Sequence, residues 1–121
     1  MEQYQVLYDE FMTSYAMNTT TGEQVGGLIA KLAGFYPSYN LTMAFAERAY
    51  ARVRKDEVLK TDEATGKAIS STKAETIAEA SQEATDFKTA RVHVQNLEML
   101  IQSAKALQRG LLQEQTYSSL N

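Results

Sequence analysis

Arginine and lysine side chains gather with a tyrosine in one stretch of the chain, between residues 48 and 73. The side chains that could contact a polyanion are Arg48, Tyr50, Arg52, Arg54, Lys55, Lys60, Lys67 and Lys73. Cations follow the phosphates of a nucleic-acid strand, while an aromatic ring stacks on its bases. The stretch therefore has the composition of a surface that binds a single nucleic-acid strand. The alternative is a solvated helix face, in which Glu47, Asp56 and Glu57 pair with the neighbouring cations.

The charge distribution sets this stretch apart from the rest of the chain. The 121 residues carry a net charge of −3. Residues 48–73 hold seven basic against four acidic residues, whereas residues 1–47 and 74–121 are net negative. A positive patch of this size can steer a phosphate backbone or an acidic partner, although the whole chain lacks the basic balance of a dedicated DNA-binding domain.

The remaining polar residues do not assemble a recognisable catalytic motif. Four acidic residues, Glu75, Glu79, Glu83 and Asp86, share a helix face through their spacing of three and four. No Glu-x-x-His pair accompanies them, which favours a solvated acidic stripe over a di-iron site. His93 is the single histidine and cysteine is absent, so neither a zinc site nor a thiolate nucleophile is expected. We predict no enzyme activity, no metal and no cofactor.

A long helix over residues 72–113 is the element around which the others must pack. Thr72 and Glu75 form a potential capping box at its start. Apolar or small residues then recur at alternating gaps of three and four, close to the coiled-coil repeat of about 3.5. They are Ile77, Ala80, Ala84, Phe87, Ala90, Val94, Leu97, Ile101, Ala104, Leu107 and Leu111. We expect self-association through the second half of this seam, which comprises Val94, Leu97, Ile101, Ala104, Leu107 and Leu111.

A shorter helix over residues 41–59 precedes it and carries most of the basic residues. Pro37 is expected to keep Tyr36 out of helical geometry, so that Ser38 or Asn40 caps this helix. Residues 61–71 form the connection, with Gly66 at its turn and a short extended excursion. The prediction is therefore an all-α fold, in which residues 41–113 form a long coiled-coil-like helical hairpin.

Residues 1–40 predict two short helices, 2–16 and 23–34, within the same single domain. The first has an aromatic face made by Tyr4, Tyr8, Phe11 and Tyr15 with Leu7. This face either covers the end of the bundle or, alternatively, docks a protein partner. Thr21 and Gln24 form a second potential capping box, and Gly26 and Gly27 could allow close helix contact. Gly34 is expected to end the second helix, and residues 114–121 read as a polar tail.

The beginning of the chain carries no basic segment followed by an apolar one, and no run of 18 apolar residues occurs. We therefore expect a soluble, cytoplasmic protein with no membrane partner.

Residues 43–112 resemble the small helical accessory proteins encoded in phage recombination modules. The likeness lies in a basic helix that bears Tyr50, a loop that contains Gly66, and a long helix that opens with Lys73-Ala74-Glu75. The resemblance implies a homo-oligomer in the host bacterial cytoplasm that binds single-stranded DNA and assists a recombinase. The eight residues named first would be its contacts. Two alternatives remain open: a protein-binding module, such as a phage inhibitor of a host defence protein, or a structural assembly subunit.

Overall fold

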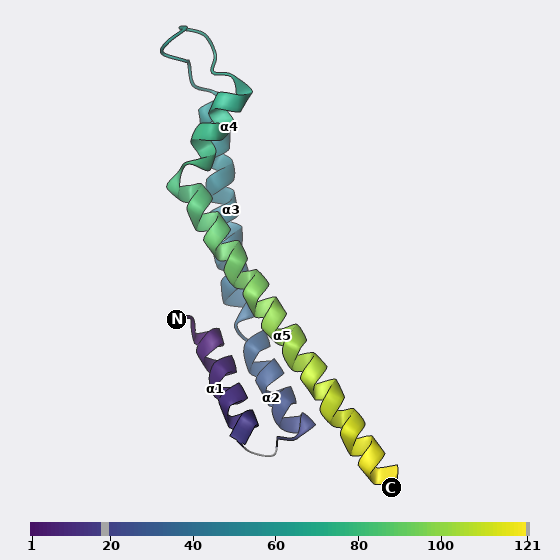
Figure 1. The fold of residues 1–121 in the computed structure, drawn as a ribbon. Helices are drawn as coiled ribbons and strands as arrows, with labels where there is room; N and C mark the ends of the chain where they lie inside the picture. Colours follow the sequence, from purple (N-terminus) through teal and green to yellow (C-terminus); the bar gives the residue numbers. More distant parts are fainter. Residues whose placement is uncertain (18–19, 121) are drawn as a thin grey trace. The chain divides into compact units, whose positions relative to one another are not determined.

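The computed structural model describes residues 1–17 and 20–120, of which Met17 and residues 115–120 are described by their backbone alone. Its helices are α1 (Gln3–Met17), α2 (Gly22–Ala33), α3 (Tyr36–Val58), α4 (Ser71–Glu79) and α5 (Gln82–Leu120), shown in Figure 1. Within these described ranges the only pairing of β type is an isolated bridge between Thr61 and Ala68. The predicted all-α fold is confirmed.

The chain divides into two compact units. Unit 1 combines Met1–Pro37 with Gln95–Asn121, and unit 2 comprises Ser38–Val94. The C-terminal part of α5 thus groups with the two N-terminal helices, and its N-terminal part groups with α4 and most of α3. The single domain with a hairpin over residues 41–113 stays a prediction.

Helix α2 of unit 1 begins at the capping box that the sequence predicts. The Thr21 hydroxyl accepts a hydrogen bond from the Gln24 backbone N–H at 3.2 Å, and the Gln24 side chain accepts one from the Thr21 N–H at 3.0 Å. This capping box fixes the first turn of α2. The buried apolar side chains described in this unit come from all three of its helices, and they are Tyr4, Val25, Leu28, Leu32, Leu97, Ile101 and Ala104.

Close packing of α2 against α5 in unit 1 depends on two glycines. The Gln108 side-chain amide donates to the Gly22 carbonyl oxygen at 3.1 Å. A Cβ atom at Gly22 would lie 3.1 Å from Leu112, and one at Gly26 would lie 3.0 Å from Gln108. Gly27 faces open space instead. The prediction of close helix contact therefore holds for Gly26 and not for Gly27.

The prediction for Pro37 was wrong. Helix α3 begins at Tyr36, ahead of the proline, and neither Ser38 nor Asn40 lies outside the helix. Pro37 occupies the first turn of α3, where a missing N–H removes no intrahelical hydrogen bond. Gly34 does end α2, in the right-handed conformation with φ of −64°.

The prediction of one continuous helix from Thr72 was also wrong. Helix α4 ends at Glu79, and α5 begins at Gln82. The Ser81 hydroxyl donates to the Ala78 carbonyl oxygen and accepts from the Ala84 N–H at 3.2 Å, so one side chain serves the end of one helix and the start of the next. Ser70, rather than the predicted Thr72, caps α4 by accepting from the Lys73 N–H.

This interruption changes the register of the seam. In α4 the buried residues are Ala74 and Ala78, whereas Ile77 and Ala80 are exposed. From Ala84 onward the seam follows the predicted positions.

The six residues predicted for self-association already lie against the chain's own helices. Val94, Leu97, Ile101 and Ala104 are buried, and Leu107 and Leu111 are half-buried. Self-association through them stays a prediction. The backbone of α5 continues to Leu120, past the predicted end at Gln113, so most of the predicted polar tail is helical; Asn121 lies outside the described residues.

Candidate nucleic-acid interface

One face of α3 in unit 2 presents three of the predicted basic residues together. Leu41, Phe45, Arg48, Arg52 and Lys55 follow one another at gaps of four and three, so they share a helix face, and all five are exposed. We call these five residues the basic stripe. Met43, Ala46, Tyr50, Val53 and Glu57 occupy the opposite side of α3 and are half-buried or buried. The helix periodicity thus separates a packed side from a cationic, solvent-facing side.

Phe45 is a member of this stripe that sequence reasoning missed. Its side chain is 57% exposed, and the Arg48 guanidinium lies over its ring, 5.8 Å from the ring centroid. An exposed ring beside cations suits base stacking. The available signal was its spacing, because Phe45 precedes Arg48 by three residues and Arg52 by seven.

Tyr50, the aromatic residue chosen from the sequence, is half-buried on the packed side of α3 in unit 2. Its ring packs edge-on against Phe87 with centroids 6.0 Å apart, and the Arg54 guanidinium lies 4.7 Å from its centroid. Tyr50 therefore contacts α5, whereas Arg54 is exposed and lies against the Tyr50 ring. The structure sets both apart from the exposed stripe.

The other predicted basic residues lie at or near the loop that joins α3 to α4, and two of them are paired. The Lys60 ammonium lies 2.6 Å from the Glu57 carboxylate, whose residue is buried. The Lys73 ammonium lies 3.1 Å from the Asp62 carboxylate. Lys67 is exposed on the same loop. Across the part of the chain that the structure describes, no ion pair involves Arg48, Arg52 or Lys55.

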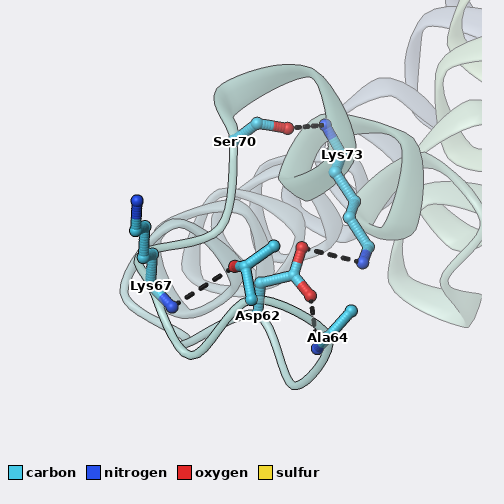
Figure 2. Close-up of polar contacts among 6 residues, drawn as sticks. Asp62, Ala64, Lys67, Ser70 and Lys73 are labelled. Carbon is cyan, nitrogen blue, oxygen red and sulfur yellow. Dashed lines mark hydrogen bonds and ion pairs between the residues drawn. The ribbon is translucent and has the colours of Figure 1, made fainter.

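Asp62 organises the loop, as Figure 2 shows. One carboxylate oxygen accepts from the Ala64 N–H at 2.9 Å, and the other accepts from the Lys73 ammonium at 3.1 Å. Its carbonyl oxygen also accepts from the Gly66 N–H at 2.8 Å. Gly66 has φ of +68°, a left-handed conformation that glycine adopts without steric cost. The predicted turn at Gly66 is confirmed, and the Thr61–Ala68 bridge provides the short extended excursion.

We expect the structure of this loop to depend on pH through Asp62. The Ala64 N–H first, and then the Lys73 ammonium, hold the pKa of the Asp62 carboxyl below its usual value. A depressed folded-state pKa stabilises the loop fully above the unfolded value of about 3.9, and this contribution is lost as pH falls through the folded value. Amide NMR shifts of Ala64 and Gly66 should therefore change below about pH 4.

Asp62→Asn should remove this titration from both amide signals, because the side chain can no longer change its charge. Glu63→Gln is the matched control at the neighbouring exposed position and should leave it intact. An unchanged titration in Asp62→Asn would contradict the assignment.

A groove of about 540 Å³ lies beside the stripe, between α3 and α5 in unit 2. Its lining consists of Thr42, Phe45, Ala46, Ala49, Gln82, Glu83, Thr85, Asp86, Thr89, Ala90 and His93. The Asp86 carboxylate accepts from the Gln82 side-chain amide at 2.8 Å. His93 packs against Tyr39, with ring centroids 5.8 Å apart. Two of the four acidic residues of the predicted stripe thus line a groove, while Glu75 and Glu79 are exposed on α4.

The aromatic face predicted as an alternative docking surface is largely engaged within unit 1. Tyr4 is 2% exposed and packs edge-on against Phe35, with centroids 6.5 Å apart. Tyr8, Phe11 and Tyr15 are half-buried. Their placement favours the role of covering the helices of this unit.

Two further features concern other site chemistry. Burial, followed by the charge of Glu98, raises the pKa of the Tyr36 phenol above its usual value.

Among residues 1–17 and 20–120, no group of three or more His, Cys, Asp or Glu side chains is arranged to hold a metal ion.

The helices of the described ranges are too short or too polar for any of them to cross a membrane. Comparison with protein-family models, with curated proteins and with solved structures finds no match to this chain.

Proposed function

We propose that this protein is a non-enzymatic helical protein that binds single-stranded nucleic acid through the basic stripe of α3. The observation that carries the proposal is the exposure of Arg48, Arg52 and Lys55 on one helix face, with no ion pair to any of them among the residues described. Unpaired cations keep their charge available for phosphates, whereas Lys60 and Lys73 already face carboxylates.

The stripe provides both contacts that a single strand needs. Arg48 and Lys55 are seven positions apart, or about 10 Å along the helix axis, and with Arg52 between them they contact successive phosphates. Phe45 stacks on a base at the N-terminal end of the stripe, with the Arg48 guanidinium over its ring. Neither contact reads the edge of a base, so the binding tolerates different sequences.

The resemblance of the element order to phage recombination accessory proteins supports single-stranded DNA as the natural ligand. By the same resemblance, the protein acts as a homo-oligomer in the bacterial cytoplasm and assists a recombinase. This part of the proposal rests on the basic helix, the Gly66 loop and the long helix that follows.

A salt titration tests the proposal. Fluorescence anisotropy with a labelled single-stranded oligonucleotide measures the dissociation constant at about 50 and 200 mM salt. Three phosphate contacts give a slope of about −2 in log affinity against log salt for single strands, so the affinity should fall about 20-fold between these two salt concentrations. A protein that remains helical by circular dichroism and does not bind at the lower salt concentration would refute the proposal.

A further inference from the structure

The groove beside the basic stripe has chemistry that complements the stripe. Its lining includes three alanines that are buried or half-buried, Ala46, Ala49 and Ala90, which we call its floor, together with the half-buried Glu83 and the exposed Asp86. In the described part of the chain, neither acidic residue forms an ion pair. The groove therefore presents both apolar and anionic groups, and it suits an occupant with an apolar side chain followed by cations.

The chain itself carries such an occupant. The basic stripe begins with Leu41, which is 57% exposed, and continues to Arg48 and Arg52. The two arginines are four residues apart and the two acidic residues of the groove are three apart, which corresponds to rises of about 6 and 4.5 Å along their helices. The charges therefore recur at a similar spacing on both surfaces.

Among the described residues, the charges of the stripe and of the groove do not pair within one copy. The stripe lies opposite the side of α3 that carries Tyr50 and Glu57, and Tyr50 packs against Phe87 of α5. Phe45 of the stripe also lines the groove, but Arg48 and Arg52 do not, and among the described residues neither arginine forms an ion pair with Glu83 or Asp86. A second copy can bring its own Arg48 and Arg52 to these two carboxylates.

We propose that the basic stripe of one copy docks in the acidic groove of a second copy, and that this contact competes with single-stranded nucleic acid for Arg48 and Arg52. Leu41 lies on the alanine floor, and the two arginines pair with Glu83 and Asp86. The contact joins two different surfaces, and it forms either once per pair of copies, in a head-to-tail chain, or twice, in a closed two-fold dimer. The contact between copies stands by itself, whereas the competition rests on the proposed function.

Two neutralised variants of the full chain test the contact. Arg48→Gln with Arg52→Gln disables the stripe, and Glu83→Gln with Asp86→Asn disables the groove. In sedimentation velocity at low salt, the wild type should gain mass with concentration, whereas each variant alone should lose that growth. An equimolar mixture should form a species of two chains and no larger, because it contains one competent stripe and one competent groove per pair.

Several results would overturn the contact. Growth of either variant to the wild-type extent would place self-association on another surface, such as the seam. A mixture whose species are no larger than those of the separate variants would show that stripe and groove do not recognise each other. Circular dichroism of each variant checks that it remains helical, so that a loss of self-association is not caused by unfolding.

The competition has its own readout. Addition of a single-stranded oligonucleotide should reduce the mass of the wild-type assembly, and the groove variant should bind that oligonucleotide at least as tightly as the wild type. If the mixture pairs but no form binds the oligonucleotide, the contact stands and both the competition and the proposed function fail. If the oligonucleotide binds without reducing the assembly, the competition alone fails.

Discussion

Leu97→Ala is expected to lower the free energy of unfolding by about 2–5 kcal/mol, the range for truncation of a large core side chain. Leu97 is 0% exposed and lies in α5 within unit 1. Its truncation removes apolar surface from the core and leaves a cavity that the surrounding helices fill only in part. A loss of this size is a large share of the stability of a small protein, about 5–15 kcal/mol.

Urea denaturation followed by circular dichroism measures this loss. Met99→Ala is the matched control, because Met99 lies two residues further along the same helix and is 61% exposed. A surface substitution of this kind should change the free energy of unfolding by no more than about 0.5 kcal/mol. Equal losses in the two variants would show that the burial of Leu97 is not what stabilises the protein.

Reversal of two charges in the basic stripe should have the largest effect on nucleic-acid binding. Arg48→Glu with Arg52→Glu removes two of the three phosphate contacts that we propose. At about 50 mM salt each contact contributes close to one order of magnitude in affinity, so a loss on the order of 50-fold or more is expected. The salt slope should also fall by roughly two thirds, because only Lys55 remains.

Lys105→Glu with Arg109→Glu supplies the control for total charge. These residues are exposed on α5 at the same spacing of four, and their reversal changes the net charge by the same amount. If binding depends on the stripe, this variant should bind far more tightly than the stripe variant. Similar losses in the two double variants would indicate that overall charge, and not the face of α3, controls the affinity.

Several features of the fold follow from short stretches of sequence. The start of α2 depends on Thr21 and Gln24, which lie three residues apart and satisfy each other's backbone N–H groups. The loop turn depends on Gly66, whose left-handed conformation is a property of the residue itself. The seam from Ala84 to Ala104 was also predictable, because regular apolar spacing along one helix leaves a single face to bury.

The candidate site was predictable only as a set of charges. The sequence placed Arg48, Arg52 and Lys55 on one helix, but it predicted Lys60 and Lys73 as nucleic-acid contacts equally. Their pairing with Glu57 and Asp62 depends on the end of α3 and on the folded loop. The choice between Tyr50 and Phe45 as the exposed ring depends on which side of α3 packs against α5.

The sequence by itself determined the helical class, the cap of α2, the Gly66 turn and the cationic character of α3, because each arises from residues close together in the chain. Only the tertiary structure decided the break at Ser81, the exposure of Ile77 and the burial of Leu97 within the chain's own core. An apolar repeat shows that a helix has a face to bury, but the same repeat fits a continuous helix or an interrupted one. It also leaves open whether neighbouring helices of the same chain or another copy will cover that face, since both remove the same apolar surface from water.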